Sequence, residues 1–195
     1  MIAVIDISGT NLTSICNALK RLGFNYQLAH EAEEIRKASH VILPGVGTAT
    51  FGMNALRQYG LIDVITSLKQ PLLGICLGMQ LLLESSEEGN VRCLGLIPGK
   101  AQRLRHKEGY PVPHMGWNQL HWNSATSLQE GLNEQEYVYF VHSYALGESK
   151  YALAHCEYSE SFTAIIHKNN IWGMQFHPEK SAEAGMTLLK NFCNC

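Results

Sequence analysis

The sequence is poor in charged residues and contains no cluster of basic ones. Of its 195 residues, 15 are Lys or Arg and 17 are Asp or Glu, which gives a formal net charge of −2 when all nine histidines are neutral. The charged fraction is 16%, well below the roughly 25% of typical soluble domains, while 46% of the residues are hydrophobic. Binding to nucleic acid is not expected, because phosphate contacts require clustered Lys and Arg. The composition instead predicts a sizeable core and excludes intrinsic disorder.

Long hydrophobic runs and a basic leader are also missing. The longest largely apolar stretch, residues 71–83, is interrupted by Gln80 and is shorter than the roughly 20 residues of a helix that spans a bilayer. No Lys or Arg precedes Lys20, so the chain does not begin like a secretory signal. We therefore predict that the protein does not bind membranes, that the mature chain begins at Met1, and that it is cytoplasmic.

The cysteines lack the regular spacing of a disulfide framework, and a chain of this length does not need one. They are Cys16, Cys76, Cys93, Cys156, Cys193 and Cys195. We predict that all six are free thiols. No other His or Cys stands at metal-ligand spacing from His177, and neither a metal nor another cofactor is expected.

The length predicts one domain over residues 1–195, and its first half alternates strands and helices. Short apolar runs predict strands at residues 2–6, 24–29, 40–43 and 72–75. Apolar residues at helical spacing predict helices at residues 12–22, 32–37, 56–69 and 77–84, with Gly60 as a break in the third. A turn at residues 8–10 and Asn11 as N-cap are expected before the first helix. This alternation is typical of a parallel sheet covered by helices on both faces.

The second half consists mostly of predicted strands. They are expected at residues 95–104, 114–121, 137–146, 152–158, 163–167 and 171–176. Asn169-Asn170 predicts a tight turn between the last two. Ser181 is the expected N-cap of a closing helix that runs to about Cys193. The predicted fold class is therefore α/β, with a central, mostly parallel sheet flanked by helices and additional antiparallel strands in the C-terminal half.

The strongest functional pattern is Gly74-Ile75-Cys76-Leu77-Gly78, between a predicted strand and a predicted helix. It matches a nucleophile elbow with cysteine in place of serine. In such a turn the nucleophile has a strained backbone, and side chains two residues before and after it would collide, which explains both glycines. The amide of Leu77 would point to where an oxyanion forms. Taken alone, the pattern fits a buried structural cysteine between packing glycines equally well.

A thiol nucleophile requires a base, and Gln175-Phe176-His177-Pro178-Glu179 offers one. His177 and Glu179 are alternate residues at the end of a predicted strand, so the carboxylate can orient the imidazole. His177 lies far from Cys76 in the sequence, and only the fold can bring the two together. On its own, a histidine in such a position is more often a core or surface residue.

Pro44-Gly45-Val46-Gly47 follows another predicted strand. Two glycines around an apolar residue allow the backbone to approach a ligand closely and to change its peptide orientation at low cost. This suits a second oxyanion donor, although an ordinary glycine turn has the same composition.

With these three motifs in this order, the chain resembles the class I (triad) glutamine amidotransferases over its whole length, which implies their flavodoxin-like fold. The matching motifs are G-I-C-L-G-M-Q at residues 74–80 and F-H-P-E-K-S at residues 176–181. Within that class it is similar to the glutaminase subunits of imidazole glycerol phosphate synthase. The motifs that carry this similarity are L-P-G-V-G at 43–47, P-H-M-G-W-N at 113–118 and Y-F-V-H-S-Y at 139–144. The anthranilate, guanylate, cytidylate and carbamoyl phosphate amidotransferases do not share P-H-M-G-W-N.

The resemblance implies a reaction in which Cys76 attacks the side-chain amide of L-glutamine, ammonia leaves, and water releases glutamate from a thioester. His177 would act as general base and then as acid, and Glu179 would orient it. The amides of Leu77 and Val46 would form the oxyanion hole. The positions that correspond to glutamine-holding ones are Gly47, Gln80, Ser143 and Tyr144.

The resemblance also implies a heterodimer with a (β/α)₈ cyclase subunit. That subunit would use the channelled ammonia to make imidazole glycerol phosphate and aminoimidazole carboxamide ribotide in histidine biosynthesis. Positions expected near the partner are Trp117, Asn118, Tyr139 and Lys180. The alternatives are that Trp117 belongs to the core, that Tyr139 is a strand aromatic and that Lys180 is a solvated charge.

Because the glutaminase domain would use all 195 residues, the ammonia acceptor is expected on a separate chain, and the sparsely charged surface is expected to include the docking face. Hydrolysis is expected to be weak until the partner binds its own substrate. Our hypothesis is that a peptide within Gly45-Val46-Gly47 changes its orientation and thereby switches hydrolysis on.

Three other interpretations remain open. A glutaminase for another acceptor, such as pyridoxal phosphate synthase, would not be expected to carry P-H-M-G-W-N. A cysteine peptidase or glyoxalase-like protein would lack the terminal H-P-E and a glutamine at the position of Gln80. An inactive scaffold subunit is disfavoured because all three triad residues are present. His106, His114, His121, His142 and His155 have no assigned role, and His142, close to Tyr144, is the first of these to test.

Overall fold

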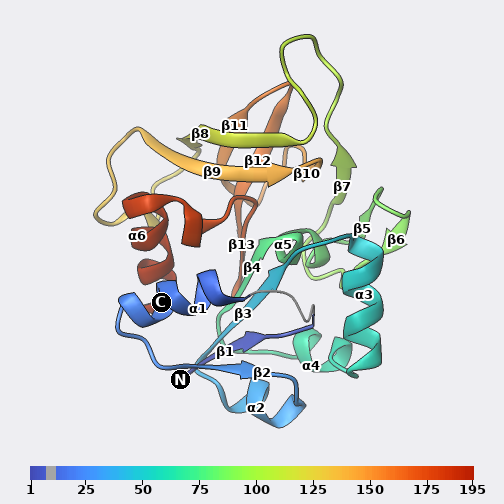
Figure 1. The fold of residues 1–195 in the computed structure, drawn as a ribbon, viewed down its shortest axis with the longest axis vertical. Helices are drawn as coiled ribbons and strands as arrows, with labels where there is room; N and C mark the ends of the chain where they lie inside the picture. Colours follow the sequence, from blue (N-terminus) through green and yellow to red (C-terminus); the bar gives the residue numbers. More distant parts are fainter. Residues whose placement is uncertain (8–11) are drawn as a thin grey trace.

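The computed structural model describes residues 1–7 and 12–195, and a nine-stranded sheet forms the centre of this described part (Figure 1). The strand order is β2-β1-β3-β4-β13-β12-β11-β8-β9. The strands from the first half are β1 (Ile2–Ile5), β2 (Tyr26–Ala29), β3 (His40–Gly45) and β4 (Leu72–Cys76). Those from the second half are β8 (His114–Trp122), β9 (Glu136–His142), β11 (Ala152–Glu157), β12 (Ser161–Lys168) and β13 (Ile171–Met174).

The sheet is mixed, with a parallel part and an antiparallel part. Strands β2, β1, β3, β4 and β13 run parallel to one another. Strands β12, β11, β8 and β9 continue the same sheet in antiparallel pairs. The expected parallel core is therefore present, and the antiparallel strands of the second half extend it. The tight turn expected at Asn169-Asn170 joins β12 to β13, with Asn169 at a φ of 58°.

A smaller four-stranded sheet, in the order β10-β7-β5-β6, lies beside the large one. Its strands are β5 (Ser85–Ser86), β6 (Val91–Arg92), β7 (Lys100–Arg103) and β10 (Tyr144–Leu146). Strand β10 follows β9 after a single residue, Ser143, so the chain passes from one sheet to the other at that point. The site described below lies at this passage.

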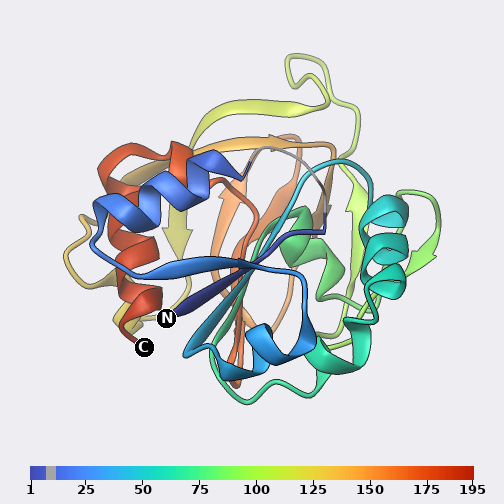
Figure 2. The same ribbon diagram turned by 60° about the horizontal axis from the view of Figure 1, so that its bottom comes forward.

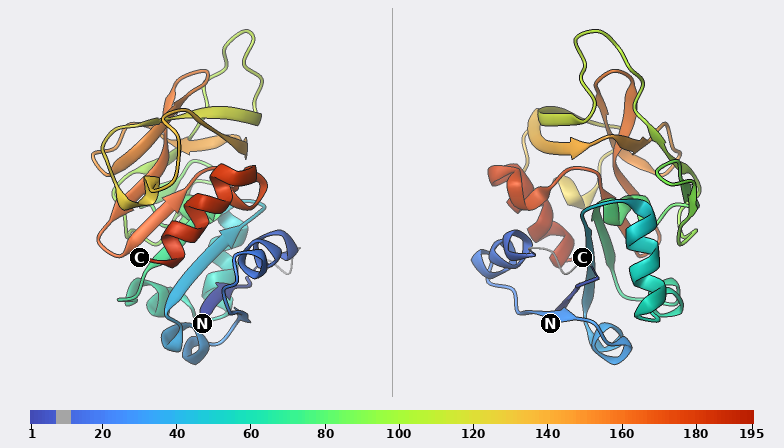
Figure 3. Two further views of the ribbon diagram at one scale, coloured as in Figure 1. Left: turned by 90° about the vertical axis from the view of Figure 1, so that its left-hand side faces the viewer. Right: turned by 45° about the vertical axis from the view of Figure 1, so that its right-hand side comes forward.

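Helices cover both faces of the parallel part. They are α1 (Thr13–Arg21), α2 (Ala32–Lys37), α3 (Ala49–Gln58), α4 (Ile62–Thr66), α5 (Leu77–Leu81) and α6 (Ala182–Cys193), with 3₁₀ turns at Ser127–Gln129 and Pro178–Lys180. Figure 2 shows α1 (blue) and α6 (red) on one side of the strands and α3 (cyan) on the other. Helices α1 and α6 lie next to one another (Figure 3), where Arg21 reaches the sulfur of Met186.

The apolar pattern of the strands explains these two layers. Along β1, Ile2 and Val4 pack into the cluster that holds α1 and α6, whereas Ala3 and Ile5 pack into the cluster that holds α2, α3 and α4. Successive side chains of a strand point to opposite faces, so a strand buried on both faces is apolar throughout. No helix within residues 1–7 and 12–195 is long and apolar enough to cross a membrane.

Several predicted boundaries were wrong. The break predicted at Gly60 is present between α3 and α4, but α3 begins earlier than predicted, at Ala49, where the Thr48 hydroxyl accepts the Phe51 amide at 3.2 Å. The strand predicted at 95–104 is formed only by β7, and the one at 137–146 divides at Ser143. The helix predicted to reach residue 84 ends at Leu81. Asn11 and the turn predicted at 8–10 lie outside the described residues.

Ser181 does precede α6, but it does not cap the helix with its side chain. Its hydroxyl donates to the carbonyl of His177 at 2.7 Å and accepts the amide of Tyr139 at 2.9 Å. Ser181 therefore ties β9 to the turn after β13. This tertiary role replaces the capping bond that the sequence predicts.

Three glycines allow β3, β4 and α5 to approach one another closely. A Cβ on Gly78 would lie 1.8 Å from the carbonyl oxygen of Leu43, and one on Gly74 would lie 2.7 Å from the backbone of Gly78. A Cβ on Gly45 would lie 2.6 Å from the Gly78 nitrogen. The obstacles are backbone atoms, so side-chain rotation cannot relieve them.

Gly78→Ala is expected to lower the free energy of unfolding by about 3 kcal/mol, because α5 must move away from β3 to admit a methyl group. Urea denaturation followed by circular dichroism measures this loss. Gly147→Ala is the matched control, since a Cβ there meets nothing within 4 Å, and its change is expected to stay within about 0.5 kcal/mol. Equal losses in the two variants would contradict the contact argument.

Candidate active site

Cys76 ends β4 in a strained backbone conformation. Its φ is 53° and its ψ is −112°, values that a residue with a side chain rarely adopts. Leu77, the next residue, is the first of α5, so its amide N–H has no partner within that helix. The predicted nucleophile elbow is thus present, with a thiol at its apex and a backbone donor beside it.

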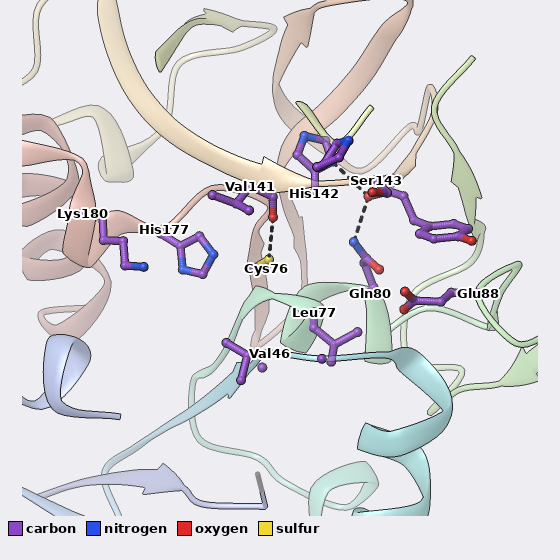
Figure 4. A pocket seen from close by; sticks show the side chains of 14 residues that line it. Val46, Cys76, Leu77, Gln80, Glu88, Val141, His142, Ser143, His177 and Lys180 are labelled. Atoms are coloured by element: carbon purple, nitrogen blue, oxygen red, sulfur yellow. Dashed lines mark hydrogen bonds between the residues drawn. The ribbon is translucent and has the colours of Figure 1, made fainter. Parts of the chain in front are cut away.

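Strand pairing brings His177 to Cys76. Strand β13 runs parallel to β4, with Met174 opposite Ile75, so the chain leaves both strands at the same edge of the sheet. The His177 imidazole then lies beside the Cys76 thiol (Figure 4). His177 follows Cys76 by 101 positions, and this single pair of neighbouring strands brings the two residues together.

Glu179 orients the imidazole, but not from a strand as predicted. The segment Pro178–Lys180 is a 3₁₀ turn, and the Glu179 carboxylate contacts Nδ1 of His177 through Oε1 at 2.9 Å. This contact leaves Nε2 as the ring nitrogen available to Cys76. Within the described residues, Oε2 of Glu179 is buried without a hydrogen-bond partner.

The surroundings of His177 favour its charged form. Burial by itself lowers the pKa of His177, but hydrogen bonds with Cys76 and Glu179, together with the charges of these two groups, raise it to about 10. The imidazole is therefore protonated at neutral pH. An imidazolium next to a thiol can stabilise a thiolate and can then donate a proton to a leaving group.

The triad opens into a cavity of about 350 Å³. Of the residues predicted to act in the site, those that line it are Val46, Gly47, Cys76, Leu77, Gln80, Ser143, Tyr144, His177 and Lys180. Figure 4 shows most of them around one space, with the Cys76 thiol facing the end of β9. The Cys76 sulfur lies 3.7 Å from the carbonyl oxygen of Val141. Glu179 lies behind His177 and lines a smaller adjoining cavity.

The glycine segment lies directly against the elbow. Gly45, the last residue of β3, is the register partner of Cys76 in β4. Val46 follows with 43% of its surface exposed, and Gly47 has a φ of 92°, which favours glycine. The backbone of this segment therefore borders the space in front of the thiol, which is the position predicted for a second oxyanion donor.

Gln80 lines the cavity, but its amide nitrogen is already engaged. The side chain is 4% exposed, and Nε2 donates to the carbonyl of Tyr144 at 2.8 Å and to Oε1 of Gln175 at 3.1 Å. Gln80 thus connects α5 to β10 and to the segment after β13. Its first role in the structure is to hold the walls of the cavity together.

The residues predicted near a partner differ in their exposure. Trp117 is 53% exposed and stands opposite the half-buried Tyr139 in the β8–β9 ladder, with ring centroids 6.0 Å apart. The alternative that Trp117 belongs to the core is therefore wrong. Lys180 is exposed at the rim of the cavity. The Asn118 amide instead donates to the Glu157 carbonyl at 2.8 Å, within the sheet.

Some polar residues of the site had no predicted role. Gln175 is fully buried, and its amide nitrogen lies 3.9 Å from the Cys76 sulfur. His142 lines the cavity and contacts the buried His114. Both Gln175 and His114 belong to motifs quoted above, but nothing in a motif states which of its members turn inward. All six cysteines are free, and the described residues contain no group of three or more His, Cys, Asp or Glu that could hold a metal ion.

Known proteins resemble the chain at three levels. The model of the family described as "Glutamine amidotransferase class-I" matches residues 3–195. The "Imidazole glycerol phosphate synthase subunit HisH 2" of Legionella pneumophila (strain Paris) is 68% identical over 192 residues, which cover 98% of this chain and 96% of that protein. The protein of the same name from Campylobacter jejuni (strain RM1221) is 49% identical over 191 residues, with the same coverage of 98% and 96%. A crystal structure of a glutamine amidotransferase has a TM-score of 0.76 at 19% identity, covering 99% of this chain and 97% of that one, which supports the fold alone.

Acid is expected to destabilise the protein through the buried histidines beside the site. Burial lowers the pKa of His114 to about 4 and that of His142 to about 3, so the unfolded chain binds protons there that the folded chain does not. Stability is therefore retained above pH 6.5 and falls below it, by about 2 kcal/mol per histidine at pH 5. Urea denaturation between pH 7.5 and 5 measures the slope. His114→Gln is expected to remove about half of this acid-induced loss of stability. A free energy of unfolding that does not change with pH in this range would contradict the conclusion that His114 and His142 are buried as neutral rings.

Proposed function

The chain belongs to the class I glutamine amidotransferases and, among them, to the HisH subunits of imidazole glycerol phosphate synthase, and from this premise we propose that it hydrolyses L-glutamine to L-glutamate and ammonia. One observation carries the proposal. A thiol on a strained elbow, Cys76, lies beside an imidazole, His177, which is hydrogen-bonded to a buried carboxylate, Glu179. This arrangement suits acyl transfer through a thioester.

In the proposed reaction, the proton of Cys76 already resides on Nε2 of His177, in agreement with the raised pKa of that imidazole, and the Cys76 thiolate attacks the side-chain carbonyl carbon of glutamine. The tetrahedral intermediate carries its negative charge on oxygen, next to the backbone of Leu77 and Val46. When the carbon–nitrogen bond breaks, His177 donates its proton to the leaving ammonia. It then takes a proton from water, which attacks the thioester and releases glutamate.

The cavity is suited to glutamine in size and polarity. Its volume of about 350 Å³ is at the small end of ligand sites. Polar groups border it at Gly47, Ser143 and Tyr144, and Lys180 stands at its rim. We assign Gly47, Gln80, Ser143 and Tyr144 to the holding of glutamine, with Gln80 acting through its hydrogen bond to the Tyr144 carbonyl.

We further propose that the ammonia is passed to a (β/α)₈ cyclase subunit in a cytoplasmic heterodimer. The 68% and 49% identical relatives are named as subunits of imidazole glycerol phosphate synthase, which favours this acceptor over that of a pyridoxal phosphate synthase. Exposed apolar side chains are found at the cavity, at Val46, and on β8, where Met115 and Trp117 pair with Val141 and Tyr139 of β9. Covering them with a partner would bury apolar surface and close the exit from Cys76 to solvent. Our hypothesis is that a peptide within Gly45-Val46-Gly47 rotates when the cyclase subunit binds its substrate, and that this rotation activates glutamine hydrolysis.

Cys76→Ala is expected to reduce glutamate release from glutamine by roughly 10⁴-fold or more, because no other group can form the thioester. The assay compares the chain alone and the chain with the cyclase subunit. Synthesis of imidazole glycerol phosphate from added ammonium salts should be unchanged in the complex, since that reaction does not use the thiol. Loss of the ammonium-driven reaction would contradict the proposal that Cys76 acts only in glutamine hydrolysis. A glutamine-like electrophile that labels a cysteine other than Cys76 would contradict the nucleophile.

Trp117→Ala is expected to weaken association with the cyclase subunit by about tenfold or more, because a half-exposed indole beside Tyr139 on the β8–β9 ladder would be buried in the complex. Isothermal titration calorimetry measures the dissociation constant. Tyr59→Ala is the matched control, since Tyr59 is a 47% exposed aromatic residue at the end of α3, outside the proposed interface. Equal affinities of the Trp117→Ala variant and the unmodified chain would place the docking face elsewhere.

A further inference from the structure

Two buried histidines next to the triad take no part in the chemistry proposed above. His114 and His142 are register partners at the end of the β8–β9 ladder, and they are 2% and 5% exposed. Their rings are joined by a contact of 3.0 Å between Nδ1 of His114 and Nε2 of His142. The other ring nitrogen of His142, Nδ1, lies 3.0 Å from the carbonyl oxygen of Tyr144.

The Tyr144 carbonyl determines the direction of these hydrogen bonds. A carbonyl oxygen only accepts, so Nδ1 of His142 must carry a proton and donate it. In a neutral ring, Nε2 of His142 is then an acceptor, and Nδ1 of His114 must donate to it. The pair therefore forms a directed chain that runs from His114 through His142 to Tyr144.

Both rings are neutral at the pH of an enzyme assay. Burial lowers the pKa of His114 to about 4, and burial lowers that of His142 to about 3 even though the hydrogen bond to the Tyr144 carbonyl opposes this shift. The His114 ring stacks on Tyr158 with centroids 3.9 Å apart, and the His142 ring lies 4.9 Å from that of Phe162. Aromatic packing thus restricts the orientation of both rings.

The chain of hydrogen bonds ends at the segment where the backbone passes between the two sheets. The Tyr144 carbonyl accepts from His142 and also from Nε2 of Gln80 at 2.8 Å, so both of its lone pairs are used. The Ser143 carbonyl accepts the Leu104 amide at 2.9 Å. Both carbonyls are fixed in this way, and the Ser143-Tyr144 backbone presents one orientation to the cavity that it lines.

We propose that His142, held in one tautomer by His114, is a positioning residue that fixes the Ser143-Tyr144 wall of the glutamine site. This inference rests on the proposed function, because it assigns that cavity to glutamine. His142 acts on the substrate only through the backbone of the wall. Its loss is therefore expected to weaken glutamine binding more than it slows the chemistry at Cys76.

Asparagine and glutamine substitutions separate this role from simple packing. At either histidine, asparagine can place its amide nitrogen where Nδ1 lies, whereas glutamine places it near Nε2. His142→Asn thus keeps a donor for Tyr144, and His142→Gln does not. If the rings only filled space, the larger glutamine would be the better replacement at both positions.

The experiment measures glutamate release against glutamine concentration, with the cyclase subunit bound, for the unmodified chain and for Asn and Gln variants of His114 and His142. We expect His142→Gln to raise the KM about tenfold and to lower kcat less than threefold, which corresponds to the loss of one hydrogen bond. His142→Asn should raise the KM less than threefold. The two variants of His114 should follow the same order with smaller effects. His121→Gln, on the same strand β8, is the control and should leave the KM unchanged.

Three results would overturn the proposal. One is a KM that responds more to Asn than to Gln, and another is a fall in the melting temperature of His142→Gln without a change in its KM. The third is available even if the variants do not fold: ¹⁵N spectra of the unmodified protein in which Nδ1 of His142 carries no proton at pH 7. If the unmodified complex does not hydrolyse glutamine at all, the proposed function fails instead, and the nitrogen spectra still test the hydrogen-bond chain.

Discussion

The backbone contact between α5 and β3 is the constraint on which the rest of the site depends. Gly78 lies so close to the Leu43 carbonyl that no side chain fits between them, and this contact lets α5 begin directly after Cys76. The short path from β4 into α5 forces Cys76 to a positive φ, which lifts the thiol to the edge of the sheet. The neighbouring strands β3 and β13 then deliver Val46 and His177 to the same edge.

Histidines within one cavity acquire opposite properties from their partners. His177 and His142 both line it, and both are largely buried. Burial determines the pKa of His142, whereas in His177 its effect on the pKa is overcome by other groups. His177 faces a carboxylate and a thiol, which raise its pKa to about 10. For His142, burial outweighs the hydrogen bond to the Tyr144 carbonyl, and the pKa falls to about 3. One ring can therefore exchange protons during a reaction, and the other can only hold a fixed hydrogen bond.

The sequence predicts the parts of this structure that depend on local patterns. Apolar runs predicted β1, β3 and β4, and glycines at fixed positions predicted the elbow at Cys76, because local sterics determine both. The start of α3 at Ala49 was missed although Thr48 is a good N-cap, because Gly52 lowers the helical signal of that segment. The division at Ser143 could not be predicted, since it depends on β7 pairing with β10 from far along the chain. The buried contact of His114 with His142 depends in the same way on the β8–β9 register.

Two parts of the fold line the cavity, the ends of the parallel strands and the passage from β9 to β10, and we assign each a different role. The parallel strands β3, β4 and β13 carry the groups to which we assign the making and breaking of bonds. The passage from β9 to β10 supplies the opposite wall, and the hydrogen bonds of Gln80 and His142 to Tyr144 tie that wall to the elbow and to strand β8. The exposed residues Met115 and Trp117 lie on β8 as well, one and three positions beyond His114. A molecule that docks on these two side chains would therefore contact the strand that holds the Ser143-Tyr144 wall of the cavity through His114.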